Sequence, residues 1–398
     1  MTYSVMETSF PATLLVCVAM FELWLHHVTC ERSKVWLTSE ISTADGHYPG
    51  KFCRITNVVL RTRDRKLYFK NDNSDFKHNV EVACNWNYIM WSIDKTSDHT
   101  ISCDKVYDSG YLFPIFYHYG NSNYYHLHYD TLMPLYHYLY YKKKNNKNTA
   151  LVPGVETKRL EVIDWTTPAF DDENKFWNRV VSILSDASPD IDMLPVNLNL
   201  ITTYDTICFK TAYLGTPKIQ RADEKFMKSF VMFVKNHFNI SHNQLDTNRV
   251  GLIKRSNRRR IKNEEELINN IRKFTDAEPL VFENMTFQEQ VQAVQSYTVL
   301  IGMNGAGLTN AIYLPPGAVA IQMVPYKAQV NAAEFGKLLK ARGPYLEWHN
   351  KHEQLSVPNY KGDHSQGDTI VNVEEFVTLV KEGLELVNSD NHLAKSEL

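Results

Sequence analysis

The fold of this chain is decided by Leu300-Ile-Gly-Met-Asn-Gly-Ala-Gly-Leu-Thr-Asn310, which Leu314-Pro-Pro-Gly317 follows closely. The apolar residues 297–301 predict a strand that runs into a glycine-rich turn and then into a helix, with Thr309 and Asn310 near its first turn. Such a turn lets the backbone approach an anion closely, and the free N–H groups of a helix N-terminus attract negative charge. A second apolar run at 318–324 completes a strand–helix–strand unit. Because glycine-rich turns also serve packing alone, the motif by itself leaves both interpretations open.

The rest of the chain predicts two α/β halves. A helix is expected over residues 123–141, kinked at Pro134, which removes a backbone donor. The polar stretch 239–248 is the candidate linker. Strands are expected at 206–209, 250–253 and 280–282, and helices at 225–238, 264–274, 287–295 and 373–387.

Several further motifs resemble glycosyltransferase family 61, whose signature reads His-Gly-Ala-Gly-Leu-Thr followed by Phe-Leu-Pro. The resemblance covers roughly residues 50–398 and implies an α/β fold of the GT-B type, with two Rossmann-like domains facing a central cleft. We expect a signal peptide or signal anchor over 1–31, an acceptor-side domain over 32–243 and a nucleotide-sugar-binding domain over 244–398. Besides the glycine stretch, the matching residues are Cys53-Arg-Ile-Thr-Asn57, Asn123-Tyr-Tyr-His126 with Asp130, Tyr204-Asp205 with Cys208-Phe-Lys210, Arg255-Ser256, Arg259, Asn263, Trp348 and Val373-Glu-Glu-Phe376.

The resemblance also implies a function. It is greatest to the branch of the family that moves N-acetylglucosamine from UDP-GlcNAc to Ser or Thr hydroxyls of EGF-like domains, with inversion at the sugar carbon. The partners would be a UDP-sugar donor and a secreted or membrane glycoprotein acceptor. Transfer of the same sugar to O-linked mannose, or of xylose to a glycan, are alternatives. The net charge of −2 gives no reason to expect a nucleic-acid partner.

The donor site is expected around the glycine turn and a basic segment after the strand at 250–253. Arginine offers a planar fork that matches phosphate oxygens, so this segment would neutralise the diphosphate of the donor. We therefore expect no catalytic metal and no cofactor. Asp190-Ile-Asp192 has the spacing of a metal-binding pair, but it follows Ser188-Pro189 and is interpreted as a solvated turn. The expected donor-site residues are Arg255, Ser256, Arg259, Asn304, Gly305, Ala306, Gly307, Leu308, Thr309 and Gln322.

Two of these residues depart from the family pattern. Asn304 stands where the signature has His, and Gln322 replaces a Glu that could accept hydrogen bonds from ribose hydroxyls. Either the donor pocket has been retuned, or catalysis has been weakened or lost. A non-catalytic protein that binds sugar nucleotides is therefore an alternative from a different functional class.

The acceptor side is expected to carry the general base. Asn123, His126 and Asp130 would share one helical face, where Asp130 would take the acceptor proton and His126 would orient it, or the reverse. Asparagine is also a common helix N-cap, and a His–Asp pair four residues apart is also a common structural contact.

The remaining signals indicate the endoplasmic reticulum lumen. The apolar stretch 10–21 has the length of the apolar core of a signal sequence, and Lys395, Ser396, Glu397 and Leu398 resemble an address read by a retrieval receptor. Asn239 and Asn284 begin glycosylation sequons. The four cysteines outside the signal region predict two disulfides with three possible pairings; they are Cys53, Cys84, Cys103 and Cys208.

Overall fold

The computed structural model of the chain describes residues 35–38, 52–61, 63, 66–69, 93–95, 102–113, 123–137, 160–164, 183–184, 191–194, 204–215, 223–241 and 248–396. The expected signal segment 1–31, Cys84, Glu397 and Leu398 lie outside these residues, and so do the side chains of Cys53 and Asp130. None of the helices in the described ranges is long and apolar enough to cross a membrane.

The chain divides into two compact units. One comprises Met1–Tyr117, Val152–Glu173 and Ser188–Lys218, and the other comprises His118–Leu151, Asn174–Ala187 and Ile219–Leu398. Each unit contains a sheet with parallel strand pairs, so the predicted α/β class is confirmed. The expected domain limits 32–243 and 244–398 stay a prediction.

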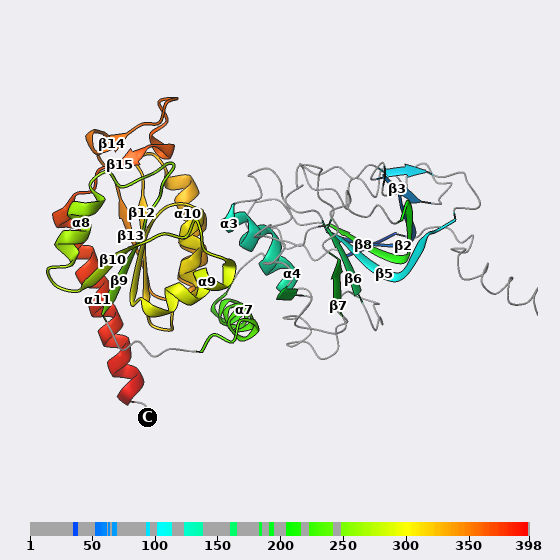
Figure 1. Cartoon of the computed structure of the whole chain (residues 1–398), viewed down its shortest axis with the longest axis horizontal. Helices are drawn as coiled ribbons and strands as arrows, with labels where there is room; N and C mark the ends of the chain where they lie inside the picture. Colours follow the sequence, from blue (N-terminus) through cyan, green and yellow to red (C-terminus); the bar gives the residue numbers. More distant parts are fainter. Residues whose placement is uncertain are drawn as a thin grey trace, which may run out of the picture. The chain divides into compact units, whose positions relative to one another are not determined.

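The first unit is built on a mixed sheet in the strand order β4-β3-β2-β8-β5-β6-β7, with β1 paired to β2 (Figure 1). The strands β1, β3 and β8 run antiparallel to β2, whereas β5, β6 and β7 run parallel to their neighbours. Asp192 lies in β7 opposite Glu161 of β6, so the solvated turn expected there is wrong from residue 191 onward. The strands are β1 (Val35–Thr38), β2 (Phe52–Arg61), β3 (Lys66–Phe69), β4 (Ile93–Lys95), β5 (Lys105–Phe113), β6 (Leu160–Asp164), β7 (Ile191–Leu194) and β8 (Thr206–Gly215).

A disulfide joins Cys103, just before β5, to Cys208 in β8. Both residues are buried and pack with Val59 of β2. The bond selects one pairing among those that the sequence left open. It closes a loop across a sequence separation of 105 residues.

The second unit is built on a fully parallel sheet in the order β10-β9-β11-β12-β13 (Figure 1). The central strands β11 and β12 are buried along their whole length, which explains their unbroken apolar sequence. The strand β10 lies earlier than the expected 280–282, because Ala277 and Leu280 are its inward residues. The strands are β9 (Arg249–Ile253), β10 (Asp276–Leu280), β11 (Val299–Met303), β12 (Val319–Val324) and β13 (Tyr345–His349).

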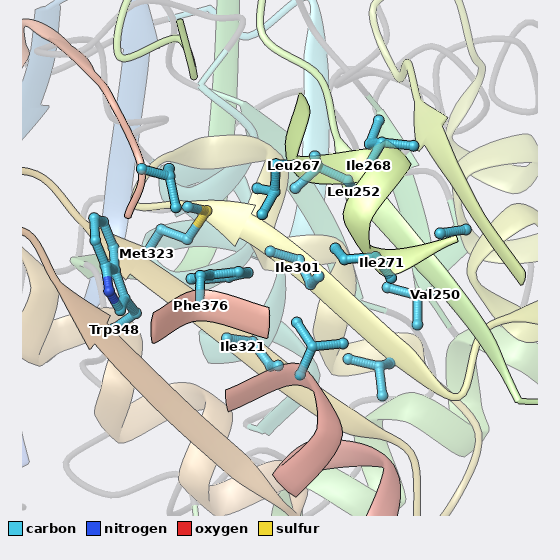
Figure 2. Packing of buried hydrophobic residues seen from close by; sticks show 14 of the residues in the cluster. Val250, Leu252, Leu267, Ile268, Ile271, Ile301, Ile321, Met323, Trp348 and Phe376 are labelled. Carbon is cyan, nitrogen blue, oxygen red and sulfur yellow. The ribbon is translucent and has the colours of Figure 1, made fainter. Parts of the chain in front are cut away.

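Helices cover both faces of this sheet. On one face, α8 (Glu264–Ile271) and α11 (Val373–Ser396) close the core of the unit, where Leu267 and Phe376 lie near Ile301 and Ile321 (Figure 2). On the other face lie α9 (Phe287–Ala293), which the short 3-10 helix η3 (Val294–Ser296) extends, and α10 (Gln329–Arg342). A small hairpin of β14 (Ser356–Val357) and β15 (Asp368–Thr369) follows β13. The 3-10 turn η5 (Glu353–Leu355) precedes the hairpin, and η6 (His364–Gln366) lies in the connection between its strands.

The expected helix over 123–141 is described from residue 124 to 137, and its middle is a π-helix. It comprises α3 (Tyr124–His126), the π-helix η1 (Leu127–Leu132) and α4 (Met133–Tyr136). Pro134 has no N–H and would clash with the carbonyl four residues earlier in an α-helix. The wider turn avoids this clash, since the N–H of Met133 bonds to the carbonyl of His128 instead.

This helix packs inside the second unit, against α7 (Glu224–His237) and the 3-10 helix η4 (Ala306–Tyr313). His128 is fully buried at the centre of the contact, among Tyr124, Phe230, Phe287 and Tyr313. Its Nδ1 lies 2.8 Å from the carbonyl oxygen of Tyr124, and its Nε2 lies 2.8 Å from the hydroxyl of Tyr313. A neutral ring satisfies both bonds, with Nδ1–H donating and Nε2 accepting. Burial accordingly lowers the pKa of His128 to about 4.

We expect loss of the Cys103–Cys208 disulfide to destabilise the first unit by about 3–5 kcal/mol, because the unfolded chain regains the entropy of a long loop. The double variant Cys103→Ala/Cys208→Ala and the oxidised wild type are compared by urea unfolding. The variant should unfold at a lower urea concentration than the oxidised wild type. Reductant should lower the unfolding midpoint of the wild type and leave that of the variant unchanged. Equal midpoints for the oxidised wild type and the variant would contradict the prediction.

We expect His128 to make the stability of the second unit depend on pH. The unfolded state, with a pKa of about 6.5, takes up the proton first. The contribution of neutral His128 to the free energy of unfolding is therefore fully present above about pH 6.5. It is lost as the pH falls toward 4, and the loss is about 2–3 kcal/mol at pH 4.5. Urea unfolding at pH 7 and pH 4.5 checks this against His128→Gln, which keeps a polar side chain that does not titrate. If wild type and variant lose the same free energy of unfolding, the assignment is wrong.

Candidate functional site

The strand order of the second unit creates a switch point between β9 and β11. The chain leaves β9 toward β10 on one side and later returns to pair β11 on the other side of β9. The connections after these two strands therefore diverge, and the crevice between them at the carboxyl ends is where ligands bind in such sheets. The loop after β9, residues 254–263, carries Arg255 and Arg259, and we call it the arginine loop. The loop after β11 carries Asn304 and Gly305.

The two loops make direct contact through both arginines. Arg259, 9% exposed, donates from Nη1 to the carbonyl oxygen of Asn304 at 2.6 Å. Arg255 donates from Nε to the carbonyl of Arg258 at 2.9 Å, and its guanidinium lies directly against Gly305. A Cβ placed on Gly305 would lie 2.0 Å from Nη1 of Arg255, so any larger residue there would force this guanidinium to move. The structure thus brings the two arginines and the glycine turn together, and their contact with a donor stays a prediction.

The site carries more positive than negative charge. Burial, followed by the charge of neighbouring guanidinium groups, lowers the pKa of Arg255 and that of Arg259, the latter to about 10. The carboxylates that oppose these shifts, those of Glu283 and Asp363, belong to exposed residues. An anion placed between the guanidinium groups would relieve their mutual repulsion, so the arrangement favours an anionic ligand.

The glycine stretch has one part that packs in the core and another that begins helix η4 beside the site. Gly302 is a packing position, because a Cβ there would lie 2.8 Å from Leu308 and 2.9 Å from Ile253. The following helix η4 is a 3-10 helix rather than the α-helix that the pattern suggests. Its first residues Ala306 and Gly307 are half-buried and directly follow Gly305, and the first N–H groups of a helix have no partner within the helix. Asn310, in contrast, is buried and donates to Gln290 of α9 at 2.8 Å.

Three side chains at the site have polar atoms without a hydrogen-bond partner among the described residues. Asn304 is fully buried with both its backbone groups bonded, yet its side-chain Nδ2 and Oδ1 are unpaired. The same holds for the Nε of Arg259 and for the hydroxyl of Thr309. Leaving such groups buried costs about 1–3 kcal/mol each unless a water or ligand completes them.

Gln322 takes part in packing between β12, β13 and α10. It is fully buried, its Nε2 donates to the carbonyl of Ala332 at 3.3 Å, and its Oε1 accepts from Tyr345 at 2.7 Å. Ser256 is exposed and donates to Glu283 at 2.9 Å. The expected contacts of both residues with a donor stay a prediction.

Asn123 acts as the N-cap of α3. Its Oδ1 accepts from the backbone N–H of Tyr125 at 3.2 Å and of His126 at 3.5 Å, which is the structural role that its residue type suggested. His126 is half-buried against the ring of Tyr125. Asp130 follows in η1. Since α3 contacts η4, these residues belong to the same unit as the glycine stretch.

Other predicted positions are consistent with their residue types. Asn239 and Asn284, at the start of the two sequons, are both exposed. Lys395 and Ser396 lie in α11. Within the described ranges, no three His, Cys, Asp or Glu side chains come together as a metal site, and the expected independence from metal stays a prediction.

Sequence reasoning missed two sets of residues. His128 and Tyr313 are 185 positions apart and meet only through the packing of α3 and η1 on η4. Arg260 and Asp368 are 108 positions apart and form a partly buried ion pair at the loop that follows β9. Neither pair has a local signal, because each partner is unremarkable in its own stretch of sequence.

Comparison with known proteins agrees with this site. Residues 124–321, which run from α3 to β12, match the family model for Glycosyltransferase 61. The Drosophila melanogaster EGF domain-specific O-linked N-acetylglucosamine transferase is 25% identical over 200 residues, covering 46% of this chain and 38% of that protein. The Rattus norvegicus protein of the same name is 27% identical over 216 residues, covering 47% and 40%.

A second kind of relative also matches. The Mus musculus protein O-linked-mannose beta-1,4-N-acetylglucosaminyltransferase 2 is 23% identical over 186 residues, covering 40% of this chain and 32% of that protein. The chain thus matches about two fifths or less of the length of these three relatives. The matched region contains the arginine loop, the glycine stretch and the helix with His126 and Asp130. On this evidence residues 124–321 of the chain are a glycosyltransferase family 61 domain.

Proposed function

We propose that this chain is an inverting glycosyltransferase that uses a UDP-sugar donor. The observation that carries the proposal is the convergence of Arg255 and Arg259 on the backbone of Asn304 and Gly305 at the β9–β11 switch point. A diphosphate carries charge and geometry that suit two guanidinium groups and the N–H groups of a glycine turn. The family match supports the same conclusion from independent evidence.

The proposed reaction places the donor diphosphate between the arginines and residues 305–308. A hydroxyl of the acceptor loses its proton to Asp130 or His126 and attacks C1 of the sugar, while the bond between C1 and the phosphate oxygen breaks. The leaving group gains negative charge, and Arg255 and Arg259 neutralise it without a metal ion. In the proposed GT-B arrangement, a second Rossmann-like domain faces this site and presents the acceptor.

The finer assignment is N-acetylglucosamine as the sugar and Ser or Thr of EGF-like domains as the acceptor. The names of the first relatives support it. The second kind of relative supports O-linked mannose as an alternative acceptor. The proposed location is the endoplasmic reticulum lumen, with a C-terminal retrieval address, and both exposed sequons fit that compartment.

One observation favours a second candidate function, a protein that binds a sugar nucleotide without turnover. Asn304 and Gln322 stand where the family has titratable residues, and both amides are fully buried. An amide keeps hydrogen bonding but cannot exchange a proton near neutral pH. Restoring His at 304 and Glu at 322 in a double variant separates the candidates, since a disabled enzyme would gain activity sharply.

We expect Arg259→Gln to weaken binding of UDP by about tenfold or more, because a buried charge-assisted contact to the diphosphate is lost. Gly305→Ala should act similarly, since its Cβ displaces the guanidinium of Arg255. Isothermal titration with UDP measures both. Lys254→Gln is the matched control, because Lys254 is an exposed cation at the start of the same loop and pairs with Glu264. If Arg259→Gln binds UDP as tightly as this control does, the diphosphate site is wrongly placed.

We expect acceptor-dependent UDP release in EDTA as well as in manganese. The assay uses UDP-GlcNAc with a folded EGF domain and a mannosyl peptide as competing acceptors. Asp130→Asn should lower turnover by about 100-fold or more if Asp130 is the base, while UDP binding is retained. Unchanged turnover would leave His126 as the candidate base. Tight UDP binding with no turnover on either acceptor would support the non-catalytic candidate.

A further inference from the structure

The arginine loop is tied along one side to the hairpin that follows β13. Asp368 of β15 accepts three hydrogen bonds from Arg260: from its backbone N–H at 2.9 Å, from Nε at 3.0 Å and from Nη2 at 2.7 Å. The neighbouring backbone groups also pair, since Thr369 N–H donates to Arg260 O and Lys262 N–H donates to Thr369 O, both at 2.9 Å. We call this contact the Arg260–Asp368 seam.

The seam continues at both ends. Asn263 exchanges two hydrogen bonds with the backbone of Val371, at 2.9 and 2.8 Å. At the other end, Arg258 donates to the side chain of Gln366 at 3.2 Å. The segment 258–263 is therefore held along its length by residues more than 100 positions later in the chain.

Arg259 lies at the strained point of this segment. Its φ of +55° is left-handed, a conformation that costs a non-glycine residue about 1 kcal/mol or more. The turn is fixed on both sides, because the carbonyl of Arg258 accepts from Arg255 and Arg260 is bound by Asp368. This turn directs the guanidinium of Arg259 to the carbonyl of Asn304 instead of to solvent, where Arg258 lies.

Asp368 is suited to this role by its surroundings. Its side chain is only 11% exposed, whereas that of Arg260 is 48% exposed. The hydrogen bonds from Arg260 overcome the effect of burial and hold the pKa of Asp368 below its usual range. The carboxylate therefore stays ionised at neutral pH, and the seam keeps its charge.

We propose that Asp368 is a positioning residue, which acts through Arg260 to hold Arg259 in its left-handed turn and so preorganises the anion site. The inference rests on the proposed function, because the site it organises is the proposed diphosphate site. In this proposal the β14–β15 hairpin contributes to donor binding indirectly, through the position of Arg259.

The test measures binding of inorganic pyrophosphate and of UDP by isothermal titration, at a temperature where circular dichroism shows every variant folded. We expect Asp368→Asn and Arg260→Gln each to weaken both ligands by about tenfold and by the same factor, because the loss concerns their shared diphosphate. The double variant should bind no more weakly than either single variant, since both changes remove one interaction. The matched control is Glu353→Gln, which removes an exposed carboxylate that lies 3.4 Å from Nε2 of His364 in the same hairpin region.

The outcomes separate this inference from the proposed function. If the wild type binds neither pyrophosphate nor UDP, the proposed function fails. If the wild type binds both and Asp368→Asn binds equally well, Asp368 does not position the site and the proposed function stands. Additive losses in the double variant, or an equal loss in Glu353→Gln, would mean a general structural role and would also overturn the inference. Should Asp368→Asn fail to fold, Arg260→Gln alone decides, because its side chain is half-exposed and Asp368 keeps its bond to the backbone.

Discussion

Parallel pairing of β11 with β9, Val299–Ile301 against Val250–Leu252, is the constraint on which the site depends. The two strands are separated in sequence by α8, β10 and α9, yet their carboxyl ends meet at one edge of the sheet. This pairing brings the loop with Arg255 and Arg259 against the loop with Asn304 and Gly305. A shift in register would move every inward side chain of these buried strands, so the core on both faces keeps the site in place.

The electrostatics of the site follow from that geometry. Two guanidinium groups are partly buried beside the backbone of Gly305, which has no side chain. The nearby carboxylates are exposed and offset little of the positive charge. Folding free energy is spent on this arrangement, because like charges repel and Arg259 is held in a left-handed turn. Such local cost is typical of ligand sites, where the bound ligand supplies the missing partner.

The helix that carries His126 and Asp130 is attached to the same unit by a second buried contact. His128 joins the backbone of Tyr124 to the hydroxyl of Tyr313, the last residue of η4. The glycine stretch and the helix with the candidate base are thus connected through one rigid, aromatic core. The π-turn before Pro134 sets which residues of that helix point into this core, and it is a consequence of the proline's missing donor.

The sequence by itself determined the α/β class, the strand–turn–helix–strand order around Gly305, the amphipathic helix α7, and the identity of the arginines and glycines at the site. These features are local, because apolar periodicity, glycine turns and caps depend on neighbours within a few residues. The tertiary structure alone decided the strand order, the Cys103–Cys208 pairing, the packing of His128 on Tyr313 and the seam from Arg260 to Asp368. The last three contacts join residues more than 100 positions apart, and the strand order pairs segments that other elements separate in the chain. No local pattern records such distant partners.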